Sequence, residues 1–182
     1  MSVAEEGLQL LRMSWDDYLL LPEKPKAEWV DGEVVVSPPV SYEHGDAVIS
    51  LAVALRTTLT GLRVVTEVGV WLPRNRLRAP DLMVVQRRPE GRWVTDPPVL
   101  VVEVLSPSTR SEDTMRKSGD YLSAGISQYW VVDPDARAID VFEAVDGAWE
   151  RVLRLDDAAP SGDVVVGGHG TVPLSLDEVF SV

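Results

Sequence analysis

Cysteine is absent from the 182 residues, which excludes both disulfides and thiolate metal sites. Long hydrophobic runs are absent too, since no apolar segment approaches the length that crosses a bilayer. The N-terminal stretch MSVAEEGLQLLRMSWDD is acidic and lacks the basic region and long apolar core of a signal peptide. These absences predict a cytoplasmic protein with no membrane partner.

Positive charge is scarce: 17 basic residues face 29 acidic ones, and the net charge is -12. Such a surface repels phosphate backbones and disfavours loose, non-specific nucleic-acid binding. The charge is uneven, however, because residues 133–163 are mostly acidic and six arginines crowd one earlier segment. The simplest interpretation of these arginines is a solvated strand edge. They are Arg74, Arg76, Arg78, Arg87, Arg88 and Arg92.

Length and composition fit one domain over residues 1–182, because the chain is 45% hydrophobic and no linker or repeat divides it. Apolar spacing and turn residues predict an α/β fold whose mixed central sheet is flanked by helices. The expected order is a helix at 14–22, a hairpin at 27–39, a helix at 41–61, strands at 63–72, 80–86 and 99–105, a helix at 108–125, three strands between 126 and 155, and a tail of loops with a short helix at 175–182.

The strand at 99–105, VLVVEVL, contains one acid among Val and Leu. A run of this kind is typical of a strand buried on both faces. An unpaired carboxylate there costs several kcal/mol or takes up a proton. Glu103 is therefore expected to meet a cation.

A second acid, Asp81, opens the strand RAPDLMVVQ directly after Pro80. If this strand lies beside the one that carries Glu103, both acids converge on one point, and two like charges there need a cation. Carboxylates without a His or Cys cluster suit a hard ion, so Mg²⁺ or Mn²⁺ is the expected metal. Lys117, in the following helix, has the charge needed to orient an attacking water or to offset charge on a phosphoryl oxygen.

Four blocks of the sequence, in order, resemble the Uma-type restriction endonuclease family, a branch of the PD-(D/E)xK nuclease superfamily. The blocks are EWVDGEVVVSPPVSYEH, APDLMVV, PPVLVVEVLSPSTR and K…YLSAGISQYWVVDP, and the resemblance runs from about residue 14 to 180. It implies a restriction-endonuclease-like core with an added N-terminal hairpin and C-terminal strands. It also implies a metal held by Asp81 and Glu103, DNA as the substrate, and a homodimer.

The chain departs from the superfamily pattern at one place. A plain E-x-K signature would have lysine at position 105, where this chain has Leu105. Lys117 resembles the migrated lysine of this branch. The family block also has a histidine at the position of His44, which implies a place in or near the site; the alternative is a helix-start histidine bound to backbone.

Each residue has a structural alternative. Asp81 after a proline fits a turn or strand end, Glu103 fits a pair with a buried arginine such as Arg78, and Lys117 fits a solvated helix position. Glu28 stands where the family has a recurrent glutamate, without an expected catalytic role. Tyr121, one turn after Lys117, is expected to pack and to position the lysine.

The resulting prediction is a metal-dependent endonuclease that hydrolyses DNA phosphodiesters. The alternatives are a catalytically silent nuclease fold that binds nucleic acid or protein, which the net charge favours, and a glycosidase-like carboxylate pair. The site is expected to open to solvent through one cleft. An uncompensated acid pair would also make Glu103→Gln as stable as the wild type, or more stable, without metal.

Overall fold

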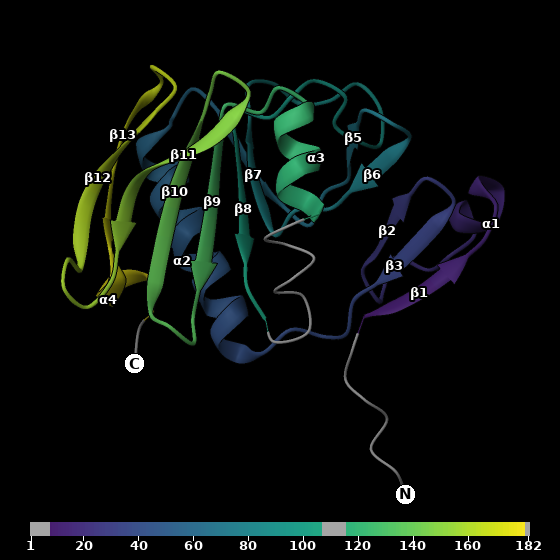
Figure 1. Cartoon of the computed structure of the whole chain (residues 1–182), viewed down its shortest axis with the longest axis horizontal. Helices are drawn as coiled ribbons and strands as arrows, with labels where there is room; N and C mark the ends of the chain where they lie inside the picture. The colour runs from purple at the N-terminus through teal and green to yellow at the C-terminus, as the bar shows by residue number, and fades with distance from the viewer. Residues whose placement is uncertain (1–7, 107–115, 181–182) are drawn as a thin grey trace, which may run out of the picture.

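The computed structural model describes residues 8–106 and 116–180 (Figure 1). Within these ranges the strands form a five-stranded sheet of order β1-β3-β2-β6-β5, a six-stranded sheet of order β11-β10-β9-β8-β7-β4, and the pair β12-β13. The N-terminal sheet and the central sheet lie side by side in Figure 1, with β7 and β8 on the side of the central sheet that is nearer the N-terminal sheet.

The N-terminal sheet is built around a tight hairpin. Asp31 and Gly32 both have positive φ, 50° and 86°, which is the backbone that a two-residue hairpin turn requires. Four tryptophans and Tyr18 pack beneath this sheet beside α1. The elements are β1 (Gln9–Arg12), α1 (Trp15–Leu19), β2 (Ala27–Val30), β3 (Glu33–Val36), β5 (Val70–Leu72) and β6 (Arg76–Arg78).

The central sheet is mixed. The strands β8 and β9 pair in parallel, whereas the other neighbours in this sheet are antiparallel. Its elements are β4 (Arg63–Thr66), β7 (Leu82–Val85), β8 (Leu100–Val104), β9 (Gln128–Asp133), β10 (Ala138–Val145) and β11 (Ala148–Leu155).

Helices cover both faces of the central sheet. On one face, α2 (Tyr42–Thr58) packs Leu51 and Leu55 against even-numbered residues of β7 and β8. The pair β12 (Ser161–Val166) and β13 (Gly170–Ser175), with α4 (Leu176–Val179), extends that core. On the other face, α3 (Ser118–Ser123) buries Tyr121 against Met83 and Val101. Figure 1 shows α2 behind the sheet and α3 in front of it.

This architecture confirms the predicted α/β class, the mixed sheet, the N-terminal hairpin and the added C-terminal strands. The expected strand at 63–72 is wrong as one element, because Glu67 has positive φ and separates β4 and β5 into different sheets. The tail is a strand pair rather than loops, and β1 and β6 were not predicted. The expected start of the helix at 108–125 lies partly outside the described residues.

Among the described residues, no helix combines the length and the apolar character needed to span a membrane.

Candidate active site

The chain passes from the N-terminal sheet into the central sheet through Arg78-Ala79-Pro80-Asp81, between β6 and β7. Pro80 keeps the preceding residue out of the helical region and favours this extended crossing. Side chains from β2, β8, α2 and α3 meet at the junction. It is therefore the point where residues distant in the sequence come together.

Asp81 and Glu103 lie opposite each other across β7 and β8. The antiparallel register pairs Leu82 with Val102, so the next pair along the strands is Asp81 with Glu103. Directly opposite residues of an antiparallel pair point to the same face of the sheet. Glu103 shares that face with Val101, toward α3, while Val102 and Val104 face the α2 core.

Asp81 is 5% exposed and is surrounded by donors. Lys26 Nζ lies 2.8 Å from its Oδ1, and His44 Nε2 lies 3.1 Å from its Oδ2. The backbone N–H of Val104 also donates to Oδ2, at 2.9 Å. Burial alone would raise the pKa of Asp81, but the charge of Lys26 and the hydrogen bond from His44 hold it well below its usual value. Burial alone would lower the pKa of Lys26, but the charges of Asp81, Glu103 and Glu28 together raise it.

Glu103 is fully buried. Its carboxylate accepts hydrogen bonds from one residue of α3 and from the residue directly before α3. Lys117 Nζ lies 3.3 Å from Glu103 Oε2, and the hydroxyl of Tyr121 donates to Oε1. Burial, followed by the negative charge of Glu103, raises the pKa of Tyr121 well above its ordinary value, so this phenol stays a donor. Positions 117 and 121 are one helical turn apart, which places both groups on the same side of the helix.

Glu28 joins the N-terminal sheet to the residue that precedes α3. It lies on β2, and its Oε2 accepts from Arg78 at 3.1 Å, while Oε1 accepts from the N–H of Ala79 at 2.7 Å and lies 3.5 Å from Lys117 Nζ. Burial by itself raises the pKa of Glu28, but the charges of Lys117 and Arg78 lower it overall.

Asp120 completes the network from α3. Its Oδ2 accepts from Arg78 Nε at 3.0 Å and from Nη2 at 2.8 Å, a two-point contact that fixes the guanidinium plane. Arg76 pairs with the other oxygen of Asp120. Since Arg78 is only 1% exposed, the interpretation of these arginines as a solvated edge is wrong for this residue.

The predicted residues Asp81, Glu103, Lys117 and His44 thus lie in one buried network. The expectation that both acids open to solvent through one cleft is not met, because both are buried and neither lines the cavity beside Leu105 or the cavity beside Lys26. His44 does start α2, after its cap Ser41, and its ring reaches Asp81. Its Nδ1 is buried without a hydrogen-bond partner among the described residues.

Sequence reasoning missed Lys26 and Asp120. Lys26 stands in the irregular stretch PEKPKAEW, where no periodicity assigns a facing. Asp120 was detectable, because it follows Lys117 by three positions and therefore shares its helix side. The number of acids expected at the site could have indicated that further charged residues lie there, because each buried carboxylate needs a cation.

The donor set decides which metal the site could hold. Among the described residues, no group of three or more His, Cys, Asp or Glu side chains is arranged as a metal site. Zinc centres need three or four such ligands, whereas Mg²⁺ keeps several waters and takes one or two carboxylates. Asp81 and Glu103 therefore fit a hard, partly hydrated ion, which would compete with Lys26 and Lys117 for the carboxylate oxygens.

The fold is that of a mixed α/β protein. A crystal structure described as "a putative nuclease belonging to DUF820" from Anabaena variabilis ATCC 29413 matches it with a TM-score of 0.73, at 20% identity, over 91% of this chain and 96% of that chain. The likeness concerns the fold. The family model Uma2, described as "Putative restriction endonuclease", matches residues 15–169. The chain belongs to this family, which supports a nuclease-like function. A search of curated proteins finds no match.

Proposed function

We propose that the protein is a divalent-metal-dependent endonuclease that hydrolyses DNA phosphodiester bonds. One observation carries this proposal: Asp81 directly precedes β7, Glu103 lies on the paired strand β8 next to the partner of Leu82, and Lys117 lies 3.3 Å from Glu103. An acid pair with an adjacent lysine suits phosphoryl chemistry, where charge develops on non-bridging oxygens. The nuclease-like family and fold agree with it.

In this proposal Asp81 and Glu103 hold Mg²⁺ or Mn²⁺, which supplies Lewis acidity for the phosphoryl group and lowers the pKa of a coordinated water. Lys117 offsets charge on the phosphate or orients the water. Tyr121 holds Glu103 in place through its hydroxyl. Lys26 and His44 do the same for Asp81.

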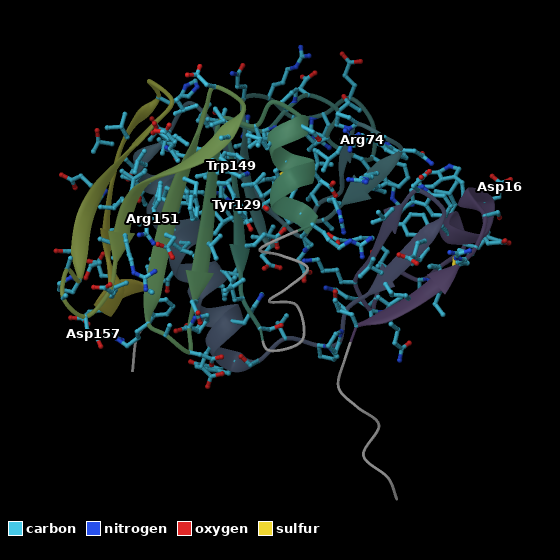
Figure 2. All side chains as sticks on the ribbon, viewed as in Figure 1. Asp16, Arg74, Tyr129, Trp149, Arg151 and Asp157 are labelled. Atoms are coloured by element: carbon cyan, nitrogen blue, oxygen red, sulfur yellow. The ribbon has the colours of Figure 1, made fainter. Side chains whose placement is uncertain are left out.

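A homodimer would let two such sites address two strands. The front face of β9–β11 is a candidate surface, because the partly exposed Trp149 lies there beside α3, above the buried Tyr129 (Figure 2). They line a cavity of about 400 Å³ together with Phe142 and Leu105. We further propose that the protein is a cytoplasmic homodimer.

One observation favours a second candidate, a silent nuclease fold that binds nucleic acid or protein. All four oxygens of Asp81 and Glu103 already face protein donors, namely Lys26, His44 with the N–H of Val104, Tyr121 and Lys117. A metal must displace or share with these groups. The two candidates differ in turnover, which can be measured directly.

The test is nicking of supercoiled plasmid with Mg²⁺, Mn²⁺ or EDTA. Wild type should nick only with metal, Glu103→Gln should lose activity by at least about a hundredfold, and Lys117→Ala should lose activity while metal affinity, measured by calorimetry, changes little. Glu150→Gln is the matched control, because Glu150 is an exposed acid on β11. A Glu103→Gln protein that nicks at the wild-type rate contradicts the mechanism. A wild type that binds metal and cuts no nucleic acid favours the silent module.

A further inference from the structure

A cavity of about 440 Å³ adjoins the acid network on the side of the N-terminal sheet. Its walls come from α1, the segment before β2, the link between β4 and β5, and the segment before Val94. Its volume lies in the range of about 300–1,000 Å³ that is typical of small-ligand pockets. Neither Asp81 nor Glu103 lines it, so it is separate from the proposed metal ligands.

Lys26 connects this cavity to the acids. Its side chain lines the cavity, and its ammonium lies 2.8 Å from Asp81 Oδ1. Ala79 also lines the cavity, two residues before Asp81, and its N–H donates to Glu28. A molecule held in the cavity would therefore lie directly beside the proposed catalytic residues.

The aromatic wall of the cavity is held in place by close packing. Trp93 lies against Gly69, where a Cβ atom would come within 2.5 Å of the indole Cδ1. The Trp93 segment is fastened by two backbone hydrogen bonds, from Val94 N to Gly69 O at 2.9 Å and from Trp71 N to Val94 O at 2.8 Å. Tyr18 donates its hydroxyl to the carbonyl of Ala27 at 2.9 Å. These contacts define ring positions without any ligand.

The charges of the lining indicate what it would bind. Three cations line the cavity, and each is paired with a carboxylate: Lys24 with Glu67, Lys26 with Asp81, and Arg92 with Glu23. The guanidinium of Arg92 lies over the Trp93 ring, 5.2 Å from its centroid. Flat rings beside cations favour a ligand that has an aromatic ring and an anionic group, and guanidinium and indole faces both stack on nucleobases.

We propose that this cavity is a subsite for one unpaired nucleotide of the nucleic-acid substrate, with its base against Trp93 and Tyr18 and its phosphate near Lys26. The inference deepens the proposed nuclease function and rests on it for the identity of the strand. A base stacked within a duplex cannot enter a cavity of this kind, whereas a single-stranded or extruded base can. The subsite therefore predicts a preference for single-stranded or locally unpaired substrate.

The test measures binding of a short fluorescein-labelled single-stranded DNA, and of the matching duplex, by anisotropy in EDTA, where metal-dependent cleavage does not occur. Wild type should bind the single strand several-fold more tightly than the duplex. Trp93→Leu should weaken single-strand binding about tenfold, in line with the loss of one stacking platform. Arg92→Gln should weaken it about threefold to tenfold. Arg88→Gln should leave it unchanged, because Arg88 is an exposed arginine of the same segment that does not line the cavity.

The subsite proposal is wrong if Trp93→Leu and Arg92→Gln bind the single strand as tightly as the wild type does, or if the wild type shows no preference for the single strand. If Trp93→Leu does not fold, as judged by circular dichroism, the test is the single-strand affinity of Arg92→Gln compared with that of Arg88→Gln, because Arg92 is exposed. Failure of the nuclease proposal is distinguishable: binding that depends on Trp93 and Arg92 in a protein that cuts nothing retains the subsite and removes hydrolysis. A protein that nicks plasmid while both variants bind normally loses the subsite alone.

Discussion

At the scale of residues, charge is balanced pair by pair in the interior. Glu103 has no exposed surface, and it is contacted by the ammonium of Lys117 and the hydroxyl of Tyr121. Removing one member of a buried ion pair leaves the other without compensation and costs more than the pair itself contributes. The expectation that Glu103→Gln would relieve repulsion was based on an acid pair without cations, so the structure argues against its physical basis.

We therefore predict that Glu103→Gln destabilises the metal-free protein by about 3 kcal/mol, because Lys117 loses its nearer carboxylate and retains Glu28 at 3.5 Å. Urea unfolding in EDTA measures this change. Glu150→Gln, at an exposed position, should change the free energy of unfolding by less than about 0.5 kcal/mol. Equal stability of Glu103→Gln and the wild type would show that the Lys117 contact contributes little.

The depressed pKa of Glu28 gives a prediction about pH. A carboxyl whose pKa is lower in the folded protein than in the unfolded chain stabilises the fold above its unfolded value of about 4.3, and this contribution is lost as the pH falls through that value toward the folded pKa. The difference in free energy of unfolding between wild type and Glu28→Gln should thus be constant above about pH 5 and shrink below about pH 4. Denaturant unfolding across this range checks it. A difference that grows with acid would mean that Glu28 is neutral in the fold.

At the scale of elements, the first turn of α2 positions a site residue. The Ser41 hydroxyl caps the helix by accepting from the N–H of His44 at 3.3 Å, and the His44 ring reaches Asp81. An N-cap serine contributes about 1 kcal/mol, so Ser41→Ala should cost about that amount. Because the cap also holds the backbone of His44, the variant should lower metal-dependent nicking.

Ser14→Ala is the matched control, since Ser14 caps α1 in the same way by accepting from Asp17 N at 3.1 Å. We expect a similar or smaller loss of stability and no loss of nicking. Equal losses of activity in both variants would indicate a general effect of stability rather than a positioning role for the α2 cap.

At the scale of the whole molecule, the net charge of -12 limits how much phosphate backbone the protein can contact. Among the residues that the structure describes, the exposed cations of this half of the molecule include Lys24, Arg92 and Arg116. We therefore predict a shallow salt dependence of DNA binding, with a slope of log K against log salt of about -2 to -4. Anisotropy from 50 to about 300 mM salt in EDTA measures it. A slope steeper than about -6 would reveal a broad phosphate-binding surface elsewhere.

The sequence by itself predicted the fold class, and it predicted that the buried carboxylate of Glu103 needs a partner. Helical spacing, the Asp-Gly turn and the buried run around Glu103 are local patterns, and local patterns determine elements because backbone preferences and side-chain periodicity act over a few residues. An acid inside an apolar strand also requires a partner wherever that strand lies. Resemblance to the family supported the roles proposed for Asp81, Glu103 and Lys117 and added the proposed role of His44.

Only the tertiary structure decided which charges meet. Lys26 reaches Asp81 across 55 positions of sequence, and Arg78 reaches Glu28 across 50 and Asp120 across 42. These contacts follow from strand register and from the packing of α3 on the sheet, and a shift of one residue in register would reverse the facing of each side chain. Ion pairing depends on distance and burial, and both are properties of the folded chain. The sequence therefore predicted that Glu103 needs a partner, and only the folded structure identified which residues contact it.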